Sequence, residues 1–223
     1  MNDSSQPPEP GPPPPSSQPL STELLARASQ GDSQAGRALL EQLLPALHAY
    51  LRLRAGAGLR ARESCSDLAQ SVCREALENL DGLEFRGEAR FRGWLFQIAL
   101  RKLVQRKRYW QAERRDARRD LELDSPAEVA ACYRTLLTPS RHARGREELT
   151  QLELSFDQLS EDHRQVILLS RIGGISHAEV ARQMSKSEGA TRVLLYRALA
   201  RLGVLLDKPG QEPPTHSAPA DTE

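Results

Sequence analysis

The sequence predicts an all-α protein made of two small helical domains, and three observations support this prediction. Residues that favour helices (Leu, Ala, Arg and Glu) are abundant, whereas aromatic residues make up only 4% of the chain. Apolar residues recur at helical spacing in two stretches, 20–112 and 146–206. Polar side chains that can cap helices precede several of the helical segments. We therefore expect a four-helix N-terminal domain and a four-helix C-terminal domain joined by a flexible linker.

The N-terminal domain, 20–112, is expected to contain four helices, over 21–31, 34–55, 64–80 and 91–112. Ser64, followed three residues later by Asp67, matches a capping pattern at the start of the third helix. Three aromatic residues of the fourth helix, Phe91, Trp94 and Phe96, lie at helical spacing, so we expect them in the core.

The C-terminal domain is expected to contain four further helices, over 146–158, 161–171, 176–184 and 187–206. Ser160 and Ser187 stand where a capping side chain would close the first turn of the second and fourth helices. Ser176 and Glu179 match a capping box at the start of the third helix. A side chain that can cap a helix therefore stands at the predicted start of three of the four helices.

Three segments lack hydrophobic spacing and are expected to lie outside the two domains. Residues 1–19 contain 8 prolines among polar residues and are predicted to be disordered, as is the tail 207–223. Residues 113–145, between the domains, are predicted to form the linker. A fully extended linker of this length spans at most about 110 Å, which leaves room for the domains to lie far apart.

Charge is unevenly distributed, although the net charge of the chain is only +1. Residues 85–119 hold 12 Lys and Arg against 3 Asp and Glu, and residues 164–201 hold 7 against 2. Such clusters of cations are typical of surfaces that bind nucleic-acid phosphates. One basic stretch alone usually forms a solvated helix face, but each of these two coincides with a recognisable motif.

Several classes of function are disfavoured by the residue pattern. The 3 Cys show no CxxC spacing and the 5 His form no ligand-spaced pair, so we expect no metal site and no cofactor. The sequence shows no paired carboxylates at ligand spacing, no phosphate-cradling glycine loop and no nucleophile beside a base, which argues against an enzyme. With no apolar run of membrane-spanning length and no signal peptide, the protein is expected in the cytoplasm.

The last two predicted helices have the dimensions of a helix-turn-helix motif. The second of them carries a core row at i, i+4, i+7 and i+11, which leaves Glu188 and Arg192 on the outside, where Arg can read guanine and Glu can accept from cytosine. The core row consists of Thr191, Leu195, Ala198 and Leu202, and the residues expected to contact DNA are Lys186, Ser187, Glu188, Arg192, Arg197 and Arg201, the cations other than Arg192 at phosphates. An ordinary helical hairpin with a charged exterior is the alternative interpretation.

Two blocks of sequence resemble the extracytoplasmic-function (ECF) family of bacterial sigma factors, which direct RNA polymerase to promoters. Residues 159–202 read LSEDHRQVILLSRIGGISHAEVARQMSKSEGATRVLLYRALARL and resemble the family's fourth conserved region, which grips the upstream (minus thirty-five) promoter element. Residues 67–110 read DLAQSVCREALENLDGLEFRGEARFRGWLFQIALRKLVQRKRYW and resemble its second conserved region. The family usually has Gly at the position of Ser185, and polar or basic residues at those of Val193 and Leu194.

The resemblance implies roles for residues of the first domain. The polymerase-docking helix of the family carries an acid-x-x-Gln pattern, which Asp67 and Gln70 match. The loop 81–90 would receive a flipped base of the downstream (minus ten) element, and the helix after it would track the DNA backbone. The residues so implied in downstream contact are Phe85, Arg86, Gly87, Glu88, Arg92, Arg101, Gln105 and Arg108.

These implications lead to one expected function and three alternatives. We expect a sigma factor that binds core RNA polymerase, at its β′ clamp region and β flap, and that recognises and opens promoter DNA. An anti-sigma factor is a further candidate partner, and no membrane is expected among the partners. The main alternative is a free-standing helix-turn-helix regulator that acts without core polymerase. An enzyme acting on nucleic acid and a helical adaptor that binds only protein are the others.

Overall fold

The structure, a computed structural model, describes residues 19–80, 87–112, 133 and 146–207 of the chain, and within these residues it contains helices and no strand. The N-terminal half contains α1 (Thr22–Ala28), α2 (Ser33–Ala55), α3 (Ala57–Arg60), α4 (Cys65–Glu78) and α5 (Glu88–Ala112). The C-terminal half contains α7 (Arg146–Asp157), α8 (Glu161–Ile167), the π-helical turn η4 (Leu168–Ile172), α9 (His177–Gln183) and α10 (Glu188–Leu206). The predicted all-α fold class is confirmed.

Side chains that accept backbone hydrogen bonds define the starts of the helices in the N-terminal half. The Asp32 carboxylate accepts from the amides of Gln34 and Ala35, at 2.9 and 3.1 Å, and so begins α2. The Ser64 hydroxyl accepts from the Asp67 amide at 3.3 Å and begins α4, as the capping pattern predicts. These amides have no acceptor within their own helix, so each cap satisfies a donor that would otherwise depend on water.

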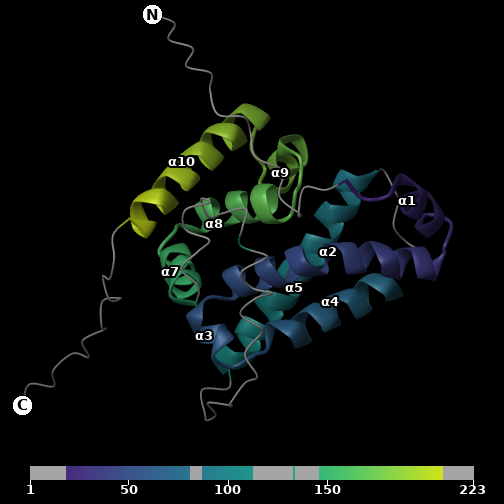
Figure 1. Ribbon diagram of the computed structural model, residues 1–223, viewed down its shortest axis with the longest axis horizontal. Coiled ribbons are helices and arrows are strands. Elements are labelled where there is room, and N and C mark those ends of the chain that lie inside the picture. Colours follow the sequence, from purple (N-terminus) through teal and green to yellow (C-terminus); the bar gives the residue numbers. More distant parts are fainter. Residues whose placement is uncertain (1–18, 81–86, 113–132, 134–145, 208–223) are drawn as a thin grey trace, which may run out of the picture.

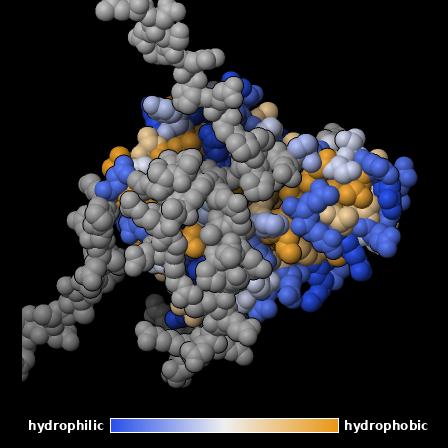
Figure 2. All heavy atoms as spheres, viewed as in Figure 1, coloured by the Kyte–Doolittle hydropathy of each residue, from blue (hydrophilic) through white to orange (hydrophobic). Residues whose placement is uncertain are grey.

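Helix α2 lies at the centre of the N-terminal half, where it contacts α1, α4 and α5. Leu39, Leu43 and Leu47 of α2 are fully buried. Tyr50 of the same helix packs on Phe96 of α5 with ring centroids 4.9 Å apart. Phe91 and Phe96 are buried as predicted, whereas Trp94 is only half-buried. Apolar side chains bordered by polar ones are visible in Figure 2 in the part of the surface where α1, α2 and α4 lie in Figure 1.

The C-terminal half begins three of its helices at the predicted serines. The hydroxyls of Ser160, Ser176 and Ser187 accept from the amide three residues further along the chain, at 3.4, 3.4 and 3.2 Å. The capping box predicted at Ser176 is therefore present in its first half. The second hydrogen bond of a capping box, from the Ser176 amide to the Glu179 side chain, is replaced. The Glu179 carboxylate instead accepts from the side chains of Arg182 and Gln183 on its own helix.

The helix predicted over 161–171 is present but changes its winding, since α8 continues into the π-helical turn η4. The Gly173 amide donates to the Leu168 carbonyl at 2.8 Å, a bond that spans five residues. Gly174 then adopts a φ of 62°, a left-handed conformation that glycine tolerates because it has no Cβ. The chain turns there and leads into α9.

The two halves pack against each other through one continuous hydrophobic core. Helix α2 contacts η4 and α7, and α5 contacts α9. The halves approach closely at Gly173, where a Cβ atom would lie 3.2 Å from the Phe96 ring across the junction and 2.9 Å from the Leu169 carbonyl oxygen of its own half. Figure 1 shows α10 and α4 at opposite edges of this body. The sequence left the relative placement of the halves open, and the structure brings them into contact.

The predicted tails and most of the predicted linker lie outside the described residues. Tyr133 falls within the range predicted as linker, yet its side chain is fully buried and its hydroxyl donates to a Glu153 carboxylate oxygen at 3.1 Å. Burial raises the pKa of the Tyr133 phenol well above its ordinary value, and the Glu153 carboxylate raises it further. The predicted domain limits remain predictions.

Candidate nucleic-acid and polymerase interfaces

Helices α9 and α10 are joined by the short turn expected of a helix-turn-helix motif. The Lys186 amide donates to the Ala181 carbonyl at 2.9 Å and closes the end of α9. Ser185 adopts a φ of 54°, a left-handed conformation that residues other than glycine rarely take and that costs about 1–2 kcal/mol. The turn thus takes a backbone form suited to glycine although it holds a serine, and Ser187 caps α10 directly afterwards.

The inner side of α10 is the core row predicted from the sequence. Thr191, Leu195, Ala198 and Leu202 are all buried, with exposed fractions of 5% or less. The Thr191 hydroxyl donates to the Ser187 carbonyl at 3.0 Å, which satisfies a polar group that would otherwise be buried without a partner. With this row against α8 and α9, the opposite side of α10 faces solvent.

All six residues predicted to contact upstream DNA are exposed: Lys186, Ser187, Glu188, Arg192, Arg197 and Arg201. Arg192 forms an ion pair with Glu188 one turn earlier, and the two side chains are 64% and 45% exposed. Lys186 lies 3.1 Å from an Asp162 carboxylate oxygen of α8. Arg197 and Arg201 form no ion pair with any residue that the structure describes, so their charges are available to phosphates.

Between these cations α10 exposes apolar side chains that the sequence reasoning did not assign to a site. Val193 is 50% exposed, Tyr196 is 76% exposed and Val204 is 48% exposed. The sequence contained one signal, because Val193 stands where the resembled family usually has a polar or basic residue. Their position opposite the buried row follows from the same helical spacing that predicts this row, whereas their exposed fractions come from the structure.

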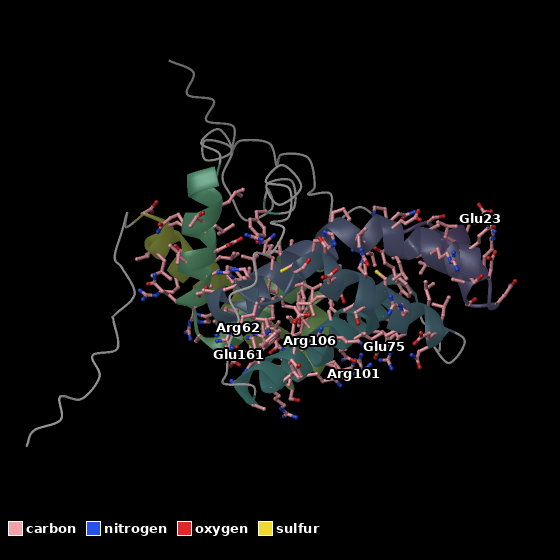
Figure 3. The ribbon with its side chains drawn as sticks, turned by 90° about the horizontal axis from the view of Figure 1, so that it is seen from below. Glu23, Arg62, Glu75, Arg101, Arg106 and Glu161 are labelled. Atoms are coloured by element: carbon pink, nitrogen blue, oxygen red, sulfur yellow. The ribbon has the colours of Figure 1, made fainter. Side chains whose placement is uncertain are left out.

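The outer face of α5 brings together three residues predicted to track downstream DNA. Arg101, Gln105 and Arg108 are all exposed on this face. Arg101 pairs with Glu75 of α4 (Figure 3). Lys102 lies 2.8 Å from the same carboxylate. The hydrogen bonds from Lys102 and Arg101 hold the pKa of Glu75 below its ordinary value, although partial burial acts in the opposite direction.

The C-terminal end of α5 is fixed by one buried carboxylate, which keeps this face turned outward. Glu63, which precedes α4, accepts from the Arg106 guanidinium at 2.6 Å and from the Trp110 indole at 2.9 Å. Arg62 lies over the Trp110 ring, 6.0 Å from its centroid. Lys107, on the inner side, donates to the Arg54 carbonyl at 3.2 Å. Burial lowers the pKa of Lys107, and the nearby positive charge of Arg54 lowers it further.

The other residues predicted at the downstream element are not all on this face. Arg92 is 2% exposed, and its guanidinium donates to the Glu88 carboxylate at 2.7 Å and to the Gly173 carbonyl at 3.3 Å. Its charge is therefore enclosed between the two halves in this conformation, and DNA contact by Arg92 stays a prediction. Gly87 is exposed, Glu88 is half-buried, and Phe85 and Arg86 lie outside the described residues.

The two residues predicted to dock polymerase share the solvent side of α4. Asp67 and Gln70 lie three residues apart, so they point the same way on the helix, and both are exposed. Leu68, Ala69 and Val72 on the other side are buried against the core. The geometry leaves Asp67 and Gln70 accessible to a protein partner.

A set of ion pairs across the junction between the halves was missed by the sequence reasoning. Glu153 of α7 accepts from Arg52 at 2.5 Å and lies 3.4 Å from Arg60, while Asp157 lies 2.9 Å from Arg60. Arg54 and Glu161 form a further pair. The partners are about a hundred residues apart in the chain, and charged residues alone carry no signal of which ones will meet.

Two classes of site find no support in the described part of the chain. Within it, no three His, Cys, Asp or Glu side chains are grouped so that they could hold a metal ion. None of its helices is both long and apolar enough to cross a membrane.

Comparison with known proteins gives a consistent picture. Residues 149–202 match the family model described as sigma-70, region 4, a range that covers all of α8, η4 and α9 and most of α7 and α10. The chain is 30% identical over 182 residues to the ECF RNA polymerase sigma factor SigD of Mycobacterium tuberculosis, covering 80% of each chain. It is also 30% identical over 184 residues to the RNA polymerase sigma factor NccH of Alcaligenes xylosoxydans xylosoxydans, covering 82% of this chain and 92% of NccH.

Solved structures agree with these sequence matches. CnrH, in complex with the cytosolic domain of CnrY, is similar with a TM-score of 0.56 and 26% identity, over 84% of this chain and 97% of CnrH. The sigma factor RpoE of Bartonella quintana, in complex with the anti-sigma factor NepR, shares the fold with a TM-score of 0.53 and 23% identity. On the strength of these matches, which span both halves, the chain belongs to the ECF family of RNA polymerase sigma factors.

Proposed function

We propose that this sigma factor binds the upstream promoter element with the outer face of α10 and core polymerase with the outer face of α4. The observation that supports the first assignment most directly is the exposure of Arg192, Arg197 and Arg201 on a helix whose inner side is fully packed. A helix of this diameter fits the major groove, where its N-terminal turns meet base edges. The protein acts with RNA polymerase in transcription initiation, a role that requires no catalytic group of its own.

Polymerase docking is assigned to Asp67 and Gln70, at the β′ clamp region, with the C-terminal half at the β flap. The support is their exposure on one side of α4 and their match to the acid-x-x-Gln pattern of the family. An anti-sigma factor is a further proposed partner, because CnrH is found in complex with the cytosolic domain of CnrY. Together with polymerase, the protein works in the cytoplasm.

Downstream contact is assigned to the basic outer face of α5 and to the loop that precedes it. Arg101, Gln105 and Arg108 form a row that phosphates could approach from solvent. Glu75 holds Arg101 in the free protein, and this pair is on the surface, so a phosphate can replace the carboxylate at little cost. Arg92 would join the site only after the junction opens.

Promoter geometry requires that the two halves separate. The upstream and downstream elements lie about 25 base pairs apart, which corresponds to about 85 Å of duplex at roughly 3.4 Å per base pair. Helices α5 and α10 belong to one compact body in this structure, joined through α9 (Figure 1). Both elements can therefore be bound together only when the contacts at the junction are broken, a step that polymerase binding would have to drive.

Charge reversal on α4 tests the docking assignment. Asp67→Arg combined with Gln70→Ala should abolish the pull-down of core polymerase, because like-charge contact and desolvation at an interface cost roughly 2–5 kcal/mol. Glu23→Arg, at an exposed position of α1, is the matched control and should bind normally. Far-UV circular dichroism should be unchanged in both. Undiminished pull-down by the double variant would overturn this assignment.

Two arginines of α10 test the upstream assignment. Arg192→Ala should cost about 1–3 kcal/mol in holoenzyme binding and relax the preference at one base position, because a guanidinium paired with a base edge discriminates. Arg197→Ala should weaken binding to all sequences alike and lower the salt slope by about one. The measurement uses a randomised upstream element at several salt concentrations. Reversed behaviour of the two variants would show that the helix faces are assigned the wrong way round.

A free-standing regulator is the alternative function, and a separate experiment distinguishes it from a sigma factor. Such a protein would bind duplex DNA with useful affinity in the absence of polymerase. Gel-shift titration of the purified protein, with and without core polymerase, separates the two functions, since a sigma factor should bind its promoter strongly only as holoenzyme.

A further inference from the structure

The centre of the outward face of α10 is apolar, and cations stand on both of its sides. Successive residues of a helix are rotated by about 100°, so Val193, Tyr196 and Ala200 project opposite the buried row. Arg192 lies on one side of this line, and Arg197 and Arg201 lie on the other. The part of α10 that would face the floor of a groove therefore carries no charge.

The dimensions of the major groove indicate which groups of the DNA the arginines and the apolar centre line of α10 would contact. The groove is about 12 Å wide and an α-helix with its side chains is about 10–12 Å across, so an inserted helix fills it. The two rims carry phosphates, which suits the arginines on either side. The floor carries base edges, and the only apolar group there is the C5 methyl of thymine. An apolar centre line thus favours thymine over the other bases.

Exposure of these side chains to water has a cost that such a contact removes. Tyr196 is 76% exposed, the largest fraction among the exposed large hydrophobic side chains of the described residues, and Val193 is 50% exposed. Single apolar residues on a surface are common, but these two are one turn apart on the same line of one helix. Val193 lies in the second turn after the Ser187 cap, where groove-entering helices present their base readers.

We propose that Val193 and Tyr196 read thymines of the upstream promoter element through their C5 methyl groups, with Val193 as the residue that sets the preference. This inference rests on the proposed placement of α10 in the major groove. It adds a specificity determinant to that placement, because the arginines alone account for guanine and phosphate contacts but give no preference for thymine.

The chain provides a matched control for the test. Val204 is 48% exposed on the same side of α10, but it lies 11 residues after Val193, which is about 16 Å further along the helix. It is therefore beyond the turns that meet base edges. Val193→Ala and Val204→Ala remove the same atoms from equally exposed positions, and both keep the helix intact because Ala is the best helix former.

The experiment replaces each thymine of the upstream element in turn by deoxyuridine, which removes only the C5 methyl group. Affinity of the holoenzyme, reconstituted with the full-length chain, is measured on a promoter selected from a random library. The wild type should lose about fourfold at one or two thymines, which corresponds to the burial of one methyl group. Val193→Ala should bind thymine and uracil equally at one of these positions, whereas Val204→Ala should behave as the wild type.

Three outcomes are distinguishable. Equal binding of thymine and uracil by the wild type at every position would overturn the inference, as would full methyl dependence in Val193→Ala. In both cases the placement of α10 could still hold, and a scrambled upstream element that weakens binding would show that it does. Wild-type holoenzyme that is insensitive to scrambling would instead overturn the proposed function itself.

Discussion

The junction between the halves and the outer face of α10 are both charged, but they differ in how their charges are satisfied. At the junction, the side chains of Arg60 and Glu153 are 11% and 9% exposed, and the Glu153 carboxylate contacts more than one donor. On α10, the paired side chains of Arg192 and Glu188 are 64% and 45% exposed. Enclosed ion pairs hold the halves in one geometry, since breaking one leaves an unpaired charge, whereas exposed pairs exchange partners at little cost.

Arginine–carboxylate pairs therefore have different roles in the two regions. At the junction the guanidinium groups are paired with carboxylates of the protein itself. These pairs hold the two halves together and leave the guanidinium groups unavailable to DNA. The α10 face keeps its guanidinium groups in water, where a phosphate or a base can take them. A substitution at the junction should therefore change stability, and a similar substitution on α10 should change stability little.

The largest expected effect is at Glu153. Glu153→Ala should lower the free energy of unfolding by about 2–4 kcal/mol, because it leaves Arg52, Arg60 and the Tyr133 hydroxyl without their shared acceptor in a mostly buried place. Glu188→Ala removes a carboxylate from the exposed pair and should change stability by less than about 1 kcal/mol. Urea denaturation followed by circular dichroism measures both. Equal losses in the two variants would remove the distinction between the regions.

The two regions also differ in the space around their glycines. Gly173→Ala should cost about 1–3 kcal/mol, because its Cβ would lie 2.9 Å from a backbone oxygen of η4 in a packed junction. Gly203→Ala on α10 meets nothing within 4 Å and should stabilise the protein by up to about 1 kcal/mol, since alanine favours a helix. Thermal unfolding of the two variants gives shifts of opposite sign. A Gly173→Ala variant as stable as the wild type would contradict the close contacts described at this position.

What the sequence could predict was set by local interactions. Ser64, Ser160 and Ser187 begin helices because a serine hydroxyl can reach an amide three residues on, and this geometry depends on nothing distant. The buried row of α10 follows in the same way from helical periodicity. Exposure of Asp67 and Gln70 opposite Leu68 and Val72 is the same kind of inference, since one helix face determines the other.

What the sequence could not predict depends on which elements meet. Arg92 belongs to a basic stretch that suggested a DNA contact, yet it is buried because Gly173, 81 residues further on, offers a carbonyl beside it. Tyr133 lies in a stretch without apolar periodicity, and it is buried against an acid of α7. In each case the residue type is compatible with two environments, and only the packing of the two halves selects one.

A double-mutant cycle sharpens the comparison at a smaller scale. Arg60 and Asp157 at the junction, with side chains 11% and 22% exposed, should show a coupling energy of about 1–2 kcal/mol. Arg27 and Asp32 on the surface of the N-terminal half, 48% and 31% exposed, should couple by about 0.2–1 kcal/mol. Both cycles use alanine variants and the free energy of unfolding in urea. A coupling at the junction that is no larger than the surface value would contradict the role of enclosure.

The smallest expected effect concerns Glu75, which joins α4 to α5 through Lys102 and Arg101 and is intermediate between the two kinds of site. Hydrogen bonds from Lys102 and Arg101 hold its pKa below the ordinary value of 4.5 in the folded protein. A depressed folded-state pKa means that the stabilisation is fully present above the unfolded value and is lost as the pH falls through the folded value. Glu75→Gln should therefore cost roughly 0.2–1 kcal/mol at neutral pH.

The cost of Glu75→Gln should shrink towards zero under acid, where the wild-type carboxyl is protonated as well. Urea denaturation of both proteins from neutral pH down to about pH 3 measures this difference directly. Glu78→Gln, an exposed acid one turn on in the same helix, controls for the loss of a negative charge on α4 and should change little at any pH. A cost that persists undiminished at low pH would mean that Glu75 stabilises the α4–α5 contact by packing, because only the ionised carboxylate can gain from the two cations beside it.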